Sequence, residues 1–182
     1  MANIRHPRRG SMQFWPRKRS RASIARIRFT PAEKKAKPLR FIGYKAGMTH
    51  IQVVDNRPKS LTKGEKIILP TTIVECPPMH VAGAVFYAFS HKVAQILVPK
   101  LEPVLGRRVP LPKKAGKTID DIKEFDDLRL LVYSASGKDA KKPKLVEVPL
   151  GGSKEEKLAY AKEILGKTIA VTDTFEPGNS LD

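Results

Sequence analysis

Residues 66–98, KIILPTTIVECPPMHVAGAVFYAFSHKVAQILV, have the composition of β strands. β-Branched and aromatic residues are concentrated in three runs, 66–76, 81–89 and 93–98, which are separated by Pro77-Pro78 and Ser90-His91. Such residues suit the pleated surface of a sheet, whereas proline and short polar pairs favour turns. Several short strands at this spacing predict a β-barrel or a β-sandwich.

The same texture begins at residue 41, and a further strand is predicted at 50–54 before a turn at 55–58. Gly43 and Gly47 flank Tyr44-Lys45-Ala46. Glycine at these positions permits a tight bend or a close approach by another backbone. A barrel corner and a ligand contact are both compatible with this spacing.

Helical and strand patterns alternate in the second part of the chain. Residues 99–117 are rich in Pro, Gly, Lys and Arg, which predicts a linker that can also touch phosphate. Ser153 and Glu156 have the spacing of a capping box, which predicts a helix through Leu165 that stops at Gly166. The other elements that we expect are a short acidic helix at 118–127 and strands at 128–134, 144–149 and 168–172.

Positive charge is concentrated at the N-terminus of a chain whose formal net charge is +17 at pH 7. Residues 1–40 contain thirteen Arg and Lys against one acid, Glu33, whereas residues 41–182 contain 22 basic and 17 acidic residues. Like charges gain no burial by collapsing together, so such a block stays extended until a polyanion neutralises it. Nucleic acid, which releases counterions on binding, is the predicted partner of this arm.

Aromatic residues lie among the cations of the arm. A ring can stack on an unpaired base while neighbouring guanidinium groups pair with phosphates, although Trp15 could instead pack onto the β part of the chain. Arg outnumbers Lys nine to four in residues 1–40, which favours structured RNA because the planar guanidinium bridges phosphates and stacks on bases. The predicted phosphate contacts are Arg5, Arg8, Arg9, Arg17, Lys18, Arg19, Arg21, Arg26 and Arg28, with His6, Phe14 and Trp15 as base-stacking or wedge residues and Lys45 as a contact at the rim.

The sequence offers little basis for catalysis. Cys76 and His80 are four residues apart, but Pro77 and Pro78 prevent a helix from aligning their side chains. The four His residues and the single Cys match no zinc spacing. We therefore predict no enzymatic activity, no metal site and no cofactor.

Composition also limits the compartment. The single Cys suits a reducing environment, and no apolar run is long enough for a membrane-spanning helix. An organellar transit peptide would also be rich in Arg, but Pro7, Gly10 and Pro16 interrupt the amphipathic helix that it needs. We expect a soluble, intracellular protein with no membrane partner.

Several motifs occur in one order along the chain: HPRRGSMQFWPRKR at 6–19, FIGYKAGMT at 41–49, DNRP at 55–58, ECPP at 75–78, GGS at 151–153 and TIAV at 168–171. Together they resemble the archaeal and eukaryotic form of the large-subunit ribosomal protein L three family, over essentially the whole chain. The resemblance implies a mainly β fold with an α+β insertion. In that fold, residues 41–98 and 167–182 form a partial Greek-key β-barrel of the translation-protein type, residues 99–166 an inserted α/β subdomain, and residues 1–40 a long basic extension that binds ribosomal RNA.

The resemblance also implies a function. Members of this family are structural constituents of the large ribosomal subunit, in the cytoplasm, that bind 23S-type ribosomal RNA and neighbouring ribosomal proteins and support early assembly near the peptidyl transferase region. The alternative from the charge pattern alone is a chromatin or DNA-associated basic protein.

The family normally continues beyond a segment like 168–182 into a further half with more barrel strands. Half a barrel would leave strand edges and apolar faces uncovered. We therefore hypothesise a split protein, whose second half is a separate polypeptide that docks on this one. A truncated chain is the competing explanation.

Overall fold

The structure is a computed structural model that describes residues 9–19, 24–25, 27, 30–112, 116, 118–122, 124–134 and 142–181. The chain divides into two compact units, Met1–Thr30 and Pro31–Asp182. The strands of the described residues all lie in the second unit, in antiparallel sheets, so the mainly β class is confirmed. These strands form a five-stranded sheet and a separate two-stranded ribbon, and the Greek-key barrel stays a prediction.

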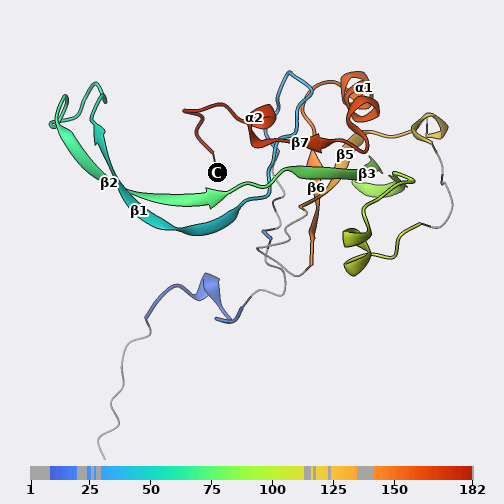
Figure 1. Cartoon of the computed structure of the whole chain (residues 1–182), viewed down its shortest axis with the longest axis horizontal. Coiled ribbons are helices and arrows are strands. Elements are labelled where there is room, and N and C mark those ends of the chain that lie inside the picture. Colours follow the sequence, from blue (N-terminus) through green and yellow to red (C-terminus); the bar gives the residue numbers. More distant parts are fainter. Residues whose placement is uncertain are drawn as a thin grey trace, which may run out of the picture. The chain divides into compact units, whose positions relative to one another are not determined.

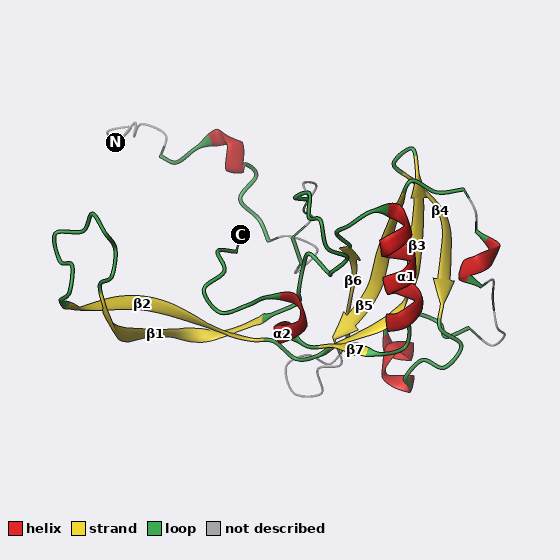
Figure 2. Ribbon diagram, turned by 90° about the horizontal axis from the view of Figure 1, so that it is seen from above, coloured by secondary structure: helices red, strands yellow, loops and turns green. Residues whose placement is uncertain are grey.

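The five-stranded sheet is organised around β3 (Met79–Ala88) and β5 (Asp127–Ser134), which pair with each other (Figures 1 and 2). β4 (His91–Leu97) pairs with the second part of β3, and β6 (Lys144–Pro149) pairs with β5. β7 (Thr168–Ile169) pairs with the first two residues of β3. Strands from both sides of residues 99–126 thus share one sheet, while the predicted division into barrel and insertion stays a prediction.

The main core lies on one face of this sheet. The apolar runs of β3 and β5 place Phe86, Leu130 and Val132 on this face with no exposed surface. Helix α1 (Lys154–Ile164) contributes Ala161 to the same core (Figure 2). Its predicted capping box is confirmed, because the Ser153 Oγ accepts from the Glu156 N–H at 3.4 Å and the Glu156 carboxylate accepts from the Ser153 N–H at 2.9 Å.

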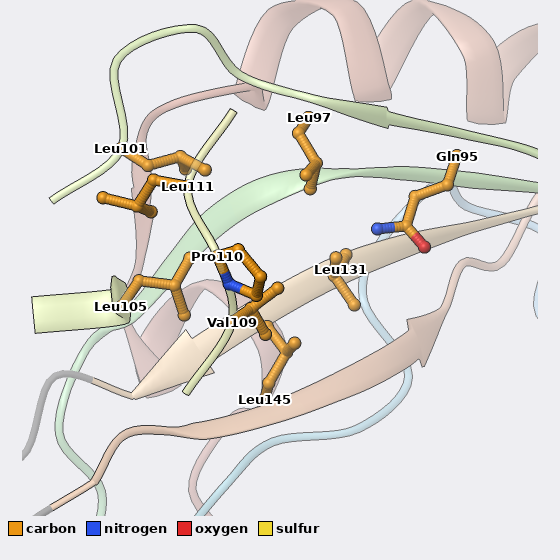
Figure 3. Close-up of a pocket in the computed structure, with 9 residues that line it drawn as sticks. All are labelled: Gln95, Leu97, Leu101, Leu105, Val109, Pro110, Leu111, Leu131 and Leu145. Atoms are coloured by element: carbon orange, nitrogen blue, oxygen red, sulfur yellow. The ribbon is translucent and has the colours of Figure 1, made fainter. Parts of the chain in front are cut away.

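The segment predicted as a linker covers the other face. It contains a 3₁₀ turn, Pro103–Arg107, in which Leu105 is buried against Ala82 and Tyr133. Leu101, Leu111 and Val109 of this segment lie over Leu131 and Leu145 of the sheet (Figure 3). The remaining cavity holds about 20 Å³, roughly the room for one water molecule. This pocket is therefore a small packing defect and not a ligand site.

The ribbon consists of β1 (Tyr44–Val54) and β2 (Lys66–Glu75), and it extends away from the five-stranded sheet (Figure 1). β1 is longer than the strand predicted at 50–54. A β-bulge between Lys45 and Gly47 shifts the register, and a Cβ at Gly43 would lie 2.5 Å from Val74 Cγ1. Gly43 therefore permits a close approach and Gly47 lies at an irregularity of the ladder, as the sequence allowed.

Two predicted elements are wrong. The described residues of 118–127 do not form the predicted helix: they contain a 3₁₀ turn, Ile119–Asp121, which ends at Ile122, whose backbone is extended. The Asp121 carboxylate accepts from the Thr118 N–H at 2.7 Å and closes this turn, and the chain then carries Phe125 into the core against Phe86. The strand predicted at 168–172 ends at Ile169, because Asp173 caps the Ala170 N–H and begins a short helix, α2 (Val171–Thr174).

Residues 31–42 pack within the second unit. The Leu39 N–H donates to the Pro149 carbonyl at 3.0 Å, and the Gly152 N–H donates to the Glu33 carbonyl at 2.8 Å. Pro38 is fully buried, and Ile42 joins the main core. Among the residues that the structure describes, no helix has the length and apolar character required to cross a membrane.

Candidate nucleic-acid interface

The longest described stretch of the first unit, residues 9–19, is built around a 3₁₀ turn at Met12–Phe14. The Ser11 hydroxyl accepts from the Gln13 N–H at 3.2 Å and starts this turn. The Trp15 N–H donates to the Met12 carbonyl at 3.2 Å and ends it. The turn places Phe14 and Trp15 next to each other between two groups of cations, as the sequence order requires.

A second interaction folds the segment back on itself. Arg17 Nη2 donates to the Arg9 carbonyl oxygen at 3.1 Å. Gly10 has a φ of +82°, and a Cβ at this position would lie 2.0 Å from Arg17 Nη2. The positive φ favours glycine at this position, because a side chain there would strain the backbone; it would also push the flexible Arg17 guanidinium away from its place. This local order was not predicted from the sequence, which indicated only an extended segment.

The segment exposes its apolar side chains. Met12, Phe14 and Trp15 keep 70%, 77% and 61% of their surface accessible. Arg9, Arg17, Lys18 and Arg19 are also exposed. Rings that face solvent among guanidinium and ammonium groups can stack on bases while the cations neutralise phosphates.

The structure places only some of the predicted site residues. Arg9, Phe14, Trp15, Arg17, Lys18 and Arg19 lie together on the described arm segment. Lys45 lies in the second unit, exposed on β1 at the bulge and opposite Val74. The other predicted contacts lie outside the described residues: Arg5, His6, Arg8, Arg21, Arg26 and Arg28.

The loop that joins β1 to β2, predicted only as a turn at 55–58, contains an ordered polar cluster. Asp55 is only 3% exposed. Its Oδ1 accepts from the Arg57 N–H and Nε–H at 3.0 and 2.9 Å, and its Oδ2 accepts from Arg57 Nη2, Ser60 Oγ and Thr62 Oγ1 at 2.9, 2.6 and 2.8 Å. These bonds, led by that from Arg57, hold the pKa of the Asp55 carboxyl well below its usual value. The signal in the sequence was an Asp with Ser and Thr five and seven residues later.

Cys76 and His80 belong to different local environments. The Cys76 sulfur lies 4.0 Å from the Val74 carbonyl oxygen. His80 stacks on Tyr133 with ring centroids 5.1 Å apart, and its Nδ1 lies 3.3 Å from Glu102 Oε1. Burial and the adjacent Glu102 raise the pKa of Tyr133 to about 12. His80 thus helps to attach the covering segment to the sheet. No group of three potential metal ligands occurs within the described ranges.

Comparison with known proteins gives one consistent family. The family model described as Ribosomal protein L3 matches residues 1–97. Large ribosomal subunit protein uL3 of Methanococcus maripaludis, strain C7, is 40% identical over 189 residues, which cover 97% of this chain and 57% of that protein. The proteins of the same name from Methanocaldococcus jannaschii and Methanothrix harundinacea are 37% and 38% identical over 99% and 100% of the chain, and 58% and 59% of their own lengths.

The chain therefore spans somewhat more than half the length of these relatives: the match covers 57% to 59% of their sequences. The family consists of structural, non-enzymatic proteins, in agreement with the prediction that the chain is not an enzyme. The matched residues include the whole arm and the ribbon, which carry most of the motifs on which the resemblance was based. The chain belongs to the Ribosomal protein L3 family.

Proposed function

We propose that the chain is a structural, RNA-binding component of the large ribosomal subunit in the cytoplasm. The observation that carries this proposal is the pair of exposed rings, Phe14 and Trp15, within a cationic segment of a chain that belongs to this family. The relatives are named as large ribosomal subunit proteins. The RNA that such a subunit offers has both the phosphates and the unpaired bases that the arm is suited to bind.

In the proposed mechanism, the cations of the arm neutralise phosphates and its rings contact bases. Each phosphate neutralised lowers the slope of log K against log salt by roughly 0.7 to 0.9. Base–aromatic stacking contributes about 1–3 kcal/mol per base. Lys45 would add a contact from the second unit. Because the arm repels itself until its charge is neutralised, we propose that it becomes fully ordered on 23S-type RNA during early assembly, near the peptidyl transferase region.

The Greek-key barrel is part of the same proposal. In the ribbon, Ile51 lies opposite Leu69 and Val53 opposite Ile67, so these side chains share one face. Ile51 and Leu69 are 42% and 41% exposed. We propose that further β strands cover this apolar face and complete the barrel. Their proposed source is a separate polypeptide of the subunit, and neighbouring ribosomal proteins are the other expected contacts.

The test is quantitative binding of the full chain to large-subunit ribosomal RNA over a range of KCl concentrations. Replacement of Arg17, Lys18 and Arg19 by Gln should make the slope of log K against log salt less negative by about two to three. A matched triple replacement of exposed lysines in the second unit, Lys100, Lys142 and Lys167, should change the slope less. Equal slopes for the two triple variants would contradict the assignment of the arm.

The stacking role has its own control. Trp15→Ala should weaken RNA binding by about 5- to 150-fold, which corresponds to 1–3 kcal/mol, without a change in the salt slope. Met12→Ala removes an equally exposed apolar side chain that has no aromatic face, and it should have a smaller effect. Competition with duplex DNA separates the alternative function: if DNA displaces the chain as readily as ribosomal RNA does, a DNA-associated protein is the better description.

A further inference from the structure

The tip of the ribbon, residues 55–65, is a closed and internally bonded loop. The Asp55 N–H donates to the Glu65 carbonyl at 3.0 Å, and the Gly64 N–H donates to the Asp55 carbonyl at 2.8 Å. Gly64 takes a φ of +87°, which permits this closure. Together with the five hydrogen bonds to the Asp55 carboxylate, these contacts fix both the ends and the middle of the loop.

The loop sorts its side chains into an inner and an outer set. Ser60 and Thr62 turn inward and donate to Asp55 Oδ2. Lys59 and Lys63 are exposed, and Leu61 between them is fully exposed at 104% of its reference surface. The inner hydrogen bonds therefore hold two ammonium groups on either side of one apolar side chain.

The net charge of this outer surface is positive. Arg57 and Asp55 form a bidentate ion pair and largely neutralise each other. The remaining exposed charges of the tip and its first flanking residue are Lys59, Lys63 and Lys66 against Glu65. A polyanion is the ligand that such a surface attracts.

RNA suits this surface better than a protein partner does. Lysine is depleted at the centres of protein–protein interfaces, whereas Lys–phosphate contacts are a standard part of RNA and DNA binding. A loop that is already ordered loses little conformational freedom on binding, in contrast to a self-repelling arm. β1 and β2 pair over ten registered positions, so they can carry the tip roughly 30 Å from the sheet at about 3.3 Å per residue.

We propose that the ribbon tip is a second, preorganised RNA contact, in which Lys59 and Lys63 bind consecutive backbone phosphates and Leu61 lies against a sugar or base between them. This proposal rests on the proposed function, since it requires that the chain bind RNA. The ribbon tip would bind RNA through a surface that is already ordered, whereas the contacts of the arm would form only on binding.

The first experiment uses the unmodified full chain. Brief lysine acetylation, with and without large-subunit ribosomal RNA, is followed by mass spectrometry of the labelled sites. We expect RNA to protect Lys59 and Lys63, together with Lys18 of the arm, several-fold more than Lys100 and Lys167. If Lys18 is protected and the tip lysines react as in the free chain, the tip proposal is wrong and the proposed function stands. If RNA protects neither group and does not bind, the proposed function itself fails.

A double variant provides the second measurement. Lys59→Gln with Lys63→Gln leaves the Asp55 hydrogen bonds intact, and it should make the slope of log K against log salt for RNA binding less negative by about two. The control, Lys100→Gln with Lys167→Gln, should leave the slope nearly unchanged. If the tip lysines are protected only in the assembled large subunit and not by ribosomal RNA alone, the tip binds a protein and the proposal is overturned.

Discussion

The five-stranded sheet and the β1–β2 ribbon are both rich in β-branched residues, yet they differ in what their faces contact. Seven of the ten residues of β3 are buried, whereas β1 and β2 contain no buried residue. α1 and the segment 101–111 cover the two faces of the sheet. Strand propensity thus explains why these residues form paired strands. Whether the side chains of those strands become buried in a core depends on the elements that cover the sheet.

This difference has an energetic consequence. A two-stranded ribbon is at best marginally stable in water without a packed face. Here the backbone ladder and the Asp55 cluster at the tip stabilise it, and its apolar face remains accessible. We infer that the sheet sets the global stability of the chain and that the ribbon responds locally.

The largest predicted effect tests this division directly. Leu130 is fully buried in β5, between Ala84 of β3 and Val148 of β6. Leu130→Ala should lower the free energy of unfolding by about 2–5 kcal/mol, because it removes buried methyl groups and leaves a cavity. Urea unfolding of the full chain, followed by circular dichroism, measures the change.

The matched change in the ribbon is Ile68→Ala, at a side chain that is 69% exposed. It should change the free energy of unfolding by no more than about 0.5 kcal/mol. Equal losses for Leu130→Ala and Ile68→Ala would mean that the isolated chain already covers the ribbon, and the contrast between the two regions would be lost.

The second predicted effect compares two glycines. A Cβ at Gly83 in β3 would lie 2.0 Å from the Ile96 carbonyl oxygen, whereas a Cβ at Gly47 in β1 would meet no atom within 4 Å. Gly83→Ala should therefore separate β3 from β4 and cost about 1–3 kcal/mol, as overpacking does. Gly47→Ala should be near neutral or stabilising by up to about 1 kcal/mol, because it restricts the unfolded chain. Thermal melting of both variants distinguishes these outcomes, and a stable Gly83→Ala protein would show that β4 moves freely.

Much of the sheet could be predicted because its signals are local. The apolar runs at 81–89 and 128–134 became β3 and β5 within two residues, since apolar and β-branched residues there favour strands in any context. The capping box at Ser153 gave the start of α1 for the same reason. The order of rings and cations along the arm is likewise readable from the sequence, while their role as RNA contacts stays a prediction.

The errors arose where a distant contact decides the local structure. The acidic residues of 118–127 suggested a helix, but Phe125 must reach Phe86, and Asp127 instead begins β5 and pairs with Lys157 at 2.8 Å. The hydrogen bond from the Asp55 N–H to the Glu65 carbonyl closes the ribbon tip. No periodic pattern of residues, of the kind that predicts a strand or a helix, marks such a closure in the sequence. Partners far along the chain, or inside a loop, are not readable from periodicity alone.

The smallest predicted effect concerns that tip, and it sharpens the comparison because it should leave the sheet untouched. The pKa of Asp55 is held below its usual value by hydrogen bonds led by that from Arg57. A carboxyl of this kind contributes its full stability above its unfolded pKa of about 3.9, and the contribution is lost progressively as pH falls from that value through the lower folded pKa. The tip should therefore keep its structure at pH 4. In ¹³C NMR, the Asp55 carboxyl should titrate below pH 3.9, and a midpoint at or above that value would show that the cluster does not hold the charged form.

The Asp55→Asn variant tests at neutral pH whether the Asp55 carboxylate holds the tip in its structure. The amide nitrogen cannot accept the bonds that one carboxylate oxygen receives, so the loop should open locally while the sheet stays folded. Trypsin should then cleave after Lys59 and Lys63 several-fold faster than in the unmodified chain. Glu65→Gln, which changes an exposed charge in the same loop, serves as the control and should leave the rate close to that of the parent protein. If Asp55→Asn instead lowers the unfolding midpoint of the whole chain as far as Leu130→Ala does, then tip and sheet unfold as one unit, and the ribbon is not the independent element that its exposed faces indicate.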